Sequence, residues 1–151
     1  MGIQPDYMMK HLTGFCLSFI GGFIALFVRI TFTRFEHNLS KLQDMNIQLF
    51  FMSADPLEKA KIFAKELNLK SKIGYRLGIE EMRKLGLYVS EPRPNEVDYI
   101  FPEPGLFSIN PKGRLHIIEI SNAPFIRPDI NLILRGINHI QENNYPIRGT
   151  H

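Results

Sequence analysis

A buried apolar strand followed at once by a strong helix start is the feature that most constrains this chain. Ile47–Met52 reads Ile-Gln-Leu-Phe-Phe-Met, which is too short for a helix and apolar enough to lie inside a sheet. Asp55, Pro56 and Glu58 follow as an N-cap, a first-turn proline and a capping-box partner. Residues 57–67 then carry an apolar helical face. Because a strand that feeds a helix is half of a βαβ unit, the sequence predicts parallel strand pairing.

Further helices and a short strand are predicted on both sides of this unit. Thr33 and Glu36 match a capping box, so a helix is expected to begin near Thr33. Residues 73–75 predict a short strand, and Ile79 to Leu85 predict a short helix. Gly86 follows that helix and is expected to end it in the left-handed conformation.

The second half of the chain predicts an antiparallel part. Residues 90–104 contain four prolines and are expected to form a long surface loop. Residues 106–109 and 114–120 predict a hairpin, because an Asn-Pro-Lys-Gly turn joins them. A last helix is expected from Asp129 to just before Asn143. The predicted class is therefore α/β with a thioredoxin-like fold, in which a central mixed sheet of a parallel βαβ part and a hairpin is flanked by helices.

The first 32 residues differ in character from the rest. Residues 12–28 form an uncharged run of 17, which is at the lower edge of the roughly 20 residues that a membrane-spanning helix needs. We therefore divide the chain into residues 1–32, an apolar N-terminal segment, and residues 33–151, the thioredoxin-like domain. A cytoplasmic location is expected, and the alternative is a membrane anchor formed by residues 12–28.

Composition excludes several classes of site. Cys16 is the only cysteine, so an internal disulfide, a Cys-x-x-Cys couple and a cysteine-rich zinc site are impossible. The five histidines have no metal-ligand spacing, and neither a metal nor another cofactor is expected. The formal charge of +3 comes from scattered residues, so no nucleic-acid partner is expected.

Seven stretches, taken in order, resemble the peroxiredoxin-like branch of the alkyl hydroperoxide reductase/thiol-specific antioxidant (redoxin) family. They cover residues 53–55, 73–77, 85–90, 103–107, 110–115, 124–128 and 145–149. The resemblance implies a thioredoxin fold, thiol peroxidase or disulfide oxidoreductase activity, and a peroxide or thiol reductant as partner. It leaves the oligomeric state open.

The family's catalytic motif is absent. In the family, a segment like Tyr-Arg-Gly-Leu-His-Cys-Pro-x-Cys-Lys precedes the first helix, whereas residues 19–32 of this chain are unlike it. One permitted coding of residues 19–32, read two bases later, translates as Tyr-Arg-Gly-Leu-His-Cys-Pro-Ile-Cys-Lys-Asn-Tyr. A frameshift, compensated near Thr33, would explain the departure, and coincidence is the alternative, since codon choice is free.

Few candidate site residues remain. Cys16 lies about nine residues before the motif's first cysteine position, and we expect an inert apolar side chain rather than a redox thiol. The resemblance places Pro104, as a cis-proline, and Arg127 near the family active site. We interpret Asp55 as a helix cap.

Three hypotheses follow. The first is a peroxiredoxin-like protein that is inactive in this form, because a thiolate is the required nucleophile. The second is a non-enzymatic, membrane-anchored thioredoxin-like binding module. The third is an interaction domain that presents the loop from Pro92 to Pro104.

Overall fold

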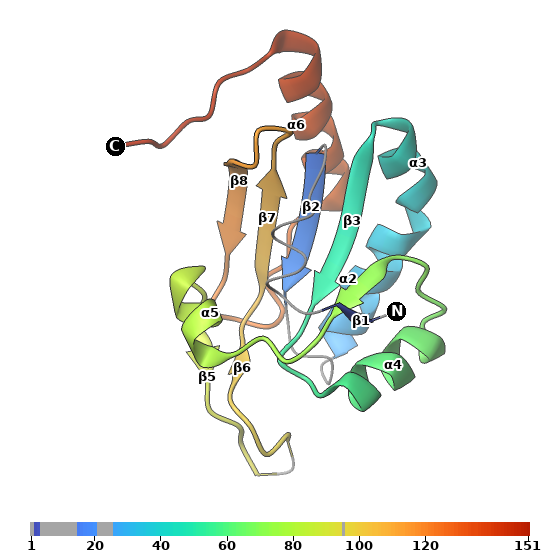
Figure 1. The fold of residues 1–151 in the computed structure, drawn as a ribbon, viewed down its shortest axis with the longest axis vertical. Coiled ribbons are helices and arrows are strands. Elements are labelled where there is room, and N and C mark those ends of the chain that lie inside the picture. Colours follow the sequence, from blue (N-terminus) through green and yellow to red (C-terminus); the bar gives the residue numbers. More distant parts are fainter. Residues whose placement is uncertain (1, 4–14, 21–25, 95) are drawn as a thin grey trace.

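The computed structural model describes residues 2–3, 15–20, 26–94 and 96–151. The strands are β1 (Gly2–Ile3), β2 (Phe15–Ile20), β3 (Ile47–Met52), β4 (Lys72–Gly74), β5 (Val89–Ser90), β6 (Phe101–Pro102), β7 (Gly105–Ile109) and β8 (Leu115–Ile120). The helices are α2 (Leu26–His37), α3 (Leu39–Asp44), α4 (Leu57–Glu66), α5 (Ile79–Lys84) and α6 (Ile130–Asn143). Six strands form one sheet in the order β1-β4-β3-β2-β7-β8, and β5 pairs with β6 (Figure 1).

The sheet combines a parallel and an antiparallel part, as the sequence predicts. β2, β3 and β4 run parallel, with Phe19 opposite Phe51 and Phe51 opposite Ile73. β7 runs antiparallel to both β2 and β8. The α/β class and the thioredoxin-like arrangement are therefore confirmed.

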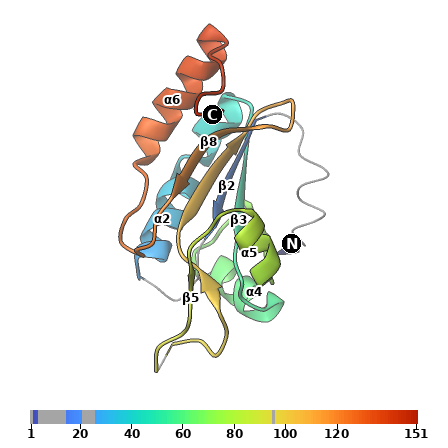
Figure 2. The ribbon, with the colours of Figure 1, turned by 90° about the vertical axis from the view of Figure 1, so that its left-hand side faces the viewer.

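Alternate residues of β3 face two separate apolar cores. Leu49 and Phe51 lie in the core that α2, α3, α4 and α6 cover, whereas Phe50 and Met52 lie in the core beneath α5. The period-2 geometry of a strand produces this division. Figure 2 shows α2 and α6 on one side of the sheet and α5 on the other.

The expected helix start at Thr33 is wrong. The helix begins at Leu26, so Thr33 lies in its interior, and Glu36 accepts hydrogen bonds from the backbone N–H groups of Lys70 and Ser71 instead of closing a capping box. The aromatic and β-branched residues in the first turns of α2 have low helix propensity. However, Val28, Phe32 and Phe35 recur at helical spacing and are all buried. Tertiary burial therefore outweighs local propensity here.

The second half of the chain agrees closely with the sequence. The turn between β7 and β8 is closed by the Gly113 N–H, which donates to the Asn110 carbonyl oxygen. Asp129 caps α6, because its side chain accepts a hydrogen bond from the backbone N–H of Leu132. Gly86 takes a φ of 69° after α5, as expected. The loop at 90–104 differs from expectation in two ways: it contains part of the β5–β6 pair, and its end is not on the surface, because Pro102, Glu103 and Pro104 are buried.

The N-terminal segment contributes to the same sheet. β2 lies between β3 and β7, at the centre of the sheet. Within the described ranges, no helix is long and apolar enough to cross a membrane. The run at 12–28 lies partly outside these ranges; within it, Phe15–Ile20 is a strand and residues 26–28 begin α2. The division at residue 32 stays a prediction.

Candidate functional site

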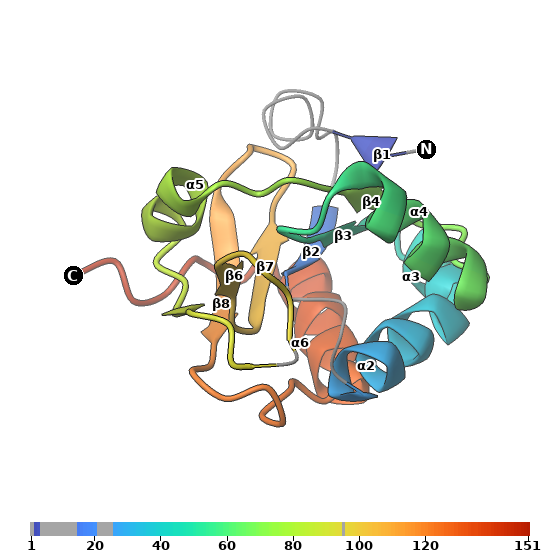
Figure 3. The ribbon, with the colours of Figure 1, turned by 90° about the horizontal axis from the view of Figure 1, so that it is seen from below.

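A pocket of about 630 Å³ lies where the parallel strands end. Its walls come from the start of α2, the residue stretch after β3, the loop that holds β5 and β6, and the segment between β8 and α6. Figure 3 views the molecule from the end at which these elements meet. Ligands of open α/β sheets bind beyond the carboxyl ends of the strands, which is where this pocket lies. The lining residues that the chemistry uses are Val28, Asp55, Tyr99, Glu103, Pro104 and Arg127.

Asp55 is a buried hydrogen-bond acceptor and not a helix cap, which corrects the sequence interpretation. The N-cap position of α4 is Pro56, and no side chain caps the helix. The Asp55 carboxylate instead accepts hydrogen bonds from the hydroxyl of Ser53 and the phenol of Tyr99, and its residue is only 2% exposed. A buried carboxylate needs such partners, since desolvation without them is costly.

The pKa of Tyr99 is raised above its ordinary value by burial and, next, by the hydrogen bond that it donates to Asp55. Its ring also lies under the ammonium of Lys59, 5.0 Å from the ring centroid. Tyr99 is therefore a neutral donor at physiological pH and holds the Pro-rich loop against the end of β3.

Arg127 is a half-buried cation in the part of the wall that comes from the segment between β8 and α6. Its Nε donates a 2.7 Å hydrogen bond to the carbonyl oxygen of Pro124. Burial lowers the pKa of Arg127 to about 10, and the negative charge of Glu103 acts in the opposite direction. At neutral pH the guanidinium is thus charged.

Glu103 is buried beside this guanidinium charge. Only 9% of its surface is exposed, and it accepts a 2.7 Å hydrogen bond from the hydroxyl of Ser90. The pocket therefore contains a cation and an anion that the fold fixes in place.

Pro104 is buried and lines the same pocket as Arg127, so the structure brings these two predicted residues together. The peptide bond before Pro104 is trans, because no cis bond occurs among the described residues, and the cis-proline expectation is wrong. The Pro104 carbonyl oxygen accepts a 3.0 Å hydrogen bond from the N–H of Ser121. The roles of Pro104 and Arg127 near an active site stay predictions.

Cys16 lies away from this pocket. In the strand register it is opposite Gln48 of β3 and Ile109 of β7, whereas the pocket end of β2 is Ile20. Four strand residues span about 13 Å, so the only thiol is at the other end of the sheet. No residue that lines the pocket is a cysteine.

The remaining site residues differ in how clearly the sequence indicates them. Ser53 and Asp55 were visible as a polar pair after a buried strand, a common place for functional groups. Tyr99 carried no signal, because it lies in a loop without periodicity, and Glu103 was visible only as the first residue of the stretch 103–107 that resembles the redoxin family. Among the described residues, no group of three or more histidine, cysteine or acidic side chains could hold a metal ion.

Comparisons with known proteins place the fold. No family model matches the chain, and no curated protein sequence matches it. Peroxiredoxin 6 of Arenicola marina superposes with a TM-score of 0.74 at 16% identity, covering 91% of this chain and 66% of that chain. A peroxiredoxin-like protein from Aquifex aeolicus superposes with a TM-score of 0.70 at 11% identity, covering 85% of this chain and 73% of that chain. AhpC of Enterococcus faecalis superposes with a TM-score of 0.71 at 16% identity, covering 91% of this chain and 83% of that chain. The chain therefore has a peroxiredoxin-like thioredoxin fold.

Proposed function

We propose that this chain is a peroxiredoxin-like protein of the thiol-dependent antioxidant and oxidoreductase class, and that it is catalytically inactive in this form. The observation that carries the proposal is the absence of a cysteine from the pocket at the start of α2. Reduction of a peroxide by this class of protein requires a thiolate sulfur that attacks a peroxide oxygen and becomes a sulfenic acid. The side chains that line the pocket offer no such nucleophile.

The surroundings of the missing thiol support descent from an active parent. Arg127 and Pro104, the two residues that the family resemblance singled out, line the same pocket as Val28 in the first turn of α2. A cation and a helix start both favour a thiolate, because each stabilises negative charge. Peroxides and a thiol reductant would be the partners of the parent protein, in the cytoplasm, and residues 33–151 would be the part retained from it.

A frameshift is our proposed cause of the missing motif. The second cysteine of the out-of-frame reading falls across Phe27 and Val28, at the start of α2. The first falls across residues 24 and 25, outside the described residues. The coding DNA decides this point: codons for residues 19–32 that cannot be read as the motif two bases later would refute the frameshift.

Peroxide consumption by the purified chain, with dithiothreitol as reductant, tests the inactivity. We expect no turnover above the buffer rate, and no difference between the wild-type chain and Cys16→Ser. Turnover that Cys16→Ser abolishes would contradict the proposal.

A second experiment puts the family motif back into the chain and tests whether activity appears. Residues 19–30 are replaced by Tyr-Arg-Gly-Leu-His-Cys-Pro-Ile-Cys-Lys-Asn-Tyr, and the matched control carries serine in place of both cysteines of that motif. If the pocket is a peroxiredoxin site, the restored chain gains reductant-dependent peroxide consumption and the serine control does not. A folded but inactive restored chain would count against the frameshift.

A further inference from the structure

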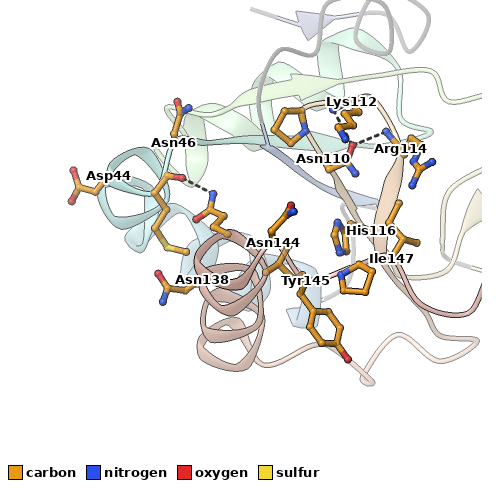
Figure 4. Close-up of a pocket in the computed structure, with 15 residues that line it drawn as sticks. Asp44, Asn46, Asn110, Lys112, Arg114, His116, Asn138, Asn144, Tyr145 and Ile147 are labelled. Carbon is orange, nitrogen blue, oxygen red and sulfur yellow. Dashed lines mark hydrogen bonds between the residues drawn. The ribbon is translucent and has the colours of Figure 1, made fainter.

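A second pocket, of about 820 Å³, lies at the opposite end of the sheet from the candidate site. It is formed by the end of α3, the turn between β7 and β8, the last turns of α6 and the chain that follows α6 (Figure 4). This volume is within the range of about 300–1,000 Å³ that small-molecule sites occupy. The pocket shares no lining residue with the candidate site.

Carboxamide side chains make up half of the polar residues that line this pocket. Five of them line it: Asn46, Asn110, Asn138, Gln141 and Asn144. Asn46, Asn138 and Asn144 make no side-chain hydrogen bond to any residue that the structure describes, whereas Gln141 donates to the Met45 carbonyl oxygen. In Asn110 the oxygen accepts hydrogen bonds from the N–H groups of Lys112 and Arg114, which leaves its NH₂ group available. Carboxamides both donate and accept, so they match ligand groups that do the same.

The side chain of Asn144 points into the space between α6 and the hairpin, as Figure 4 shows, and Asn110 and His116 lie across from it. Asn144 has a φ of 47°, because it ends α6 in the left-handed conformation. Helix termination thus explains an asparagine at this position.

Two cations add a preference for negative charge. Lys112 lies in the turn that begins at Asn110 and Arg114 directly follows it, and neither takes part in an ion pair with a described residue. Asp44 also lines the pocket, but its carboxylate points outward at the far edge in Figure 4. The charge nearest to Asn110 is therefore positive.

We propose that this pocket binds a polyhydroxylated anion of the size of a sugar phosphate. The anionic group would contact Lys112 and Arg114, since ammonium and guanidinium groups bind phosphate oxygens through charge-assisted hydrogen bonds. The hydroxyls would contact the carboxamide of Asn144, which can both donate and accept, and the NH₂ group of Asn110, which donates. Inorganic phosphate presents mostly acceptor oxygens, whereas the carboxamide oxygen of Asn144 needs a donor, so the hydroxyl-bearing part contributes to binding.

The test is an NMR titration of the ¹⁵N-labelled full chain with glucose 6-phosphate, glucose and inorganic phosphate. We expect glucose 6-phosphate to shift the backbone signals of residues 110–116 and Asn144 in a saturable way below about 1 mM, a usual range for metabolite sites. Glucose and phosphate should each bind about tenfold more weakly or worse, because each lacks one set of hydrogen bonds.

Three variants separate a built site from a charged surface. Asn144→Gly removes the carboxamide but keeps the left-handed turn, since glycine favours that conformation. It should weaken glucose 6-phosphate binding about fivefold, and Lys112→Ala about tenfold. Lys84→Ala, which removes an exposed lysine of α5 outside the pocket, is the control and should change nothing.

Three outcomes would overturn the proposal. They are the absence of saturable shifts with glucose 6-phosphate, binding of inorganic phosphate as tight as that of the sugar phosphate, and unchanged affinity in both Asn144→Gly and Lys112→Ala. None of them depends on peroxidase activity, so this proposal can fail while the proposed function holds.

Discussion

The phenol of Tyr99 donates a hydrogen bond to the carboxylate of Asp55, although the two residues are 44 positions apart. Asp55 follows β3, and Tyr99 lies in the Pro-rich loop that forms one wall of the candidate site. The same carboxylate accepts a hydrogen bond from the hydroxyl of Ser53. The Tyr99 hydrogen bond holds an irregular loop against the end of β3 and gives the pocket a fixed wall.

Removing that phenol should destabilise the fold modestly. Tyr99→Phe leaves a buried carboxylate with one donor fewer, and we expect the free energy of unfolding to fall by about 1 kcal/mol. Urea denaturation followed by circular dichroism measures the change. Tyr88→Phe is the control, because Tyr88 is 56% exposed, and it should alter stability by less than about 0.5 kcal/mol. Equal effects of the two variants would show that the contact with Asp55 contributes nothing.

Tyr99 should also ionise later than an unfolded tyrosine does. Its pKa lies above that of an unfolded tyrosine, so above about pH 10 the folded chain keeps a proton that the unfolded chain has lost. Stability that is present below that pH is therefore lost as the pH rises further. Absorbance of the phenolate across an alkaline titration should show one of the five tyrosines titrating late, and Tyr99→Phe should remove that step. A late step that persists in Tyr99→Phe would assign it to another residue.

Phe32 is expected to be a main support of the larger core. Its ring stacks on Phe51 at 4.0 Å between centroids and meets Phe63 edge-on at 5.6 Å. Phe32→Ala should lower the free energy of unfolding by about 3–5 kcal/mol, the usual cost of removing a buried aromatic ring. Phe125→Ala, at a residue 61% exposed, is the matched control and should cost less than about 1 kcal/mol. Thermal and urea unfolding of both variants check this, and a small effect at Phe32 would mean that α2 is not packed on the sheet as described.

Substitution by alanine should change the stability of the chain in opposite directions at two glycines. Gly136 lies inside α6 with nothing within 4 Å of an added Cβ, so Gly136→Ala should stabilise the chain by about 0.5–1 kcal/mol. At Gly105 an added Cβ would overlap the Cδ2 of Leu87, and it would be 3.1 Å from the ring of Phe107. Gly105→Ala should therefore destabilise by about 1–3 kcal/mol through overpacking. Melting temperatures of the two variants test both signs, and a rise for Gly105→Ala would show that Leu87 can move aside without cost.

The sequence predicts elements well where its signals are local. β3 was expected with the bounds that the structure has, and α6 was expected with Asp129 at its start, because strand length, turn residues and caps act over a few positions. The start of α2 was missed for the opposite reason. Val28, Phe32 and Phe35 have helical spacing, but the β-branched and aromatic residues among them hid it, and only burial against the sheet makes that segment helical.

For the candidate site too, some features follow from the sequence alone and others depend on tertiary structure. The sequence alone determined that one thiol exists, at Cys16, and that no second cysteine can assist it, because composition does not depend on folding. Tertiary structure decided that Cys16 lies at the other end of β2 from the pocket, that Asp55 accepts hydrogen bonds instead of capping α4, and that Pro104 and Arg127 share one cavity. These relationships join residues far apart in the chain, and only the packing of helices and loops on the sheet brings them together.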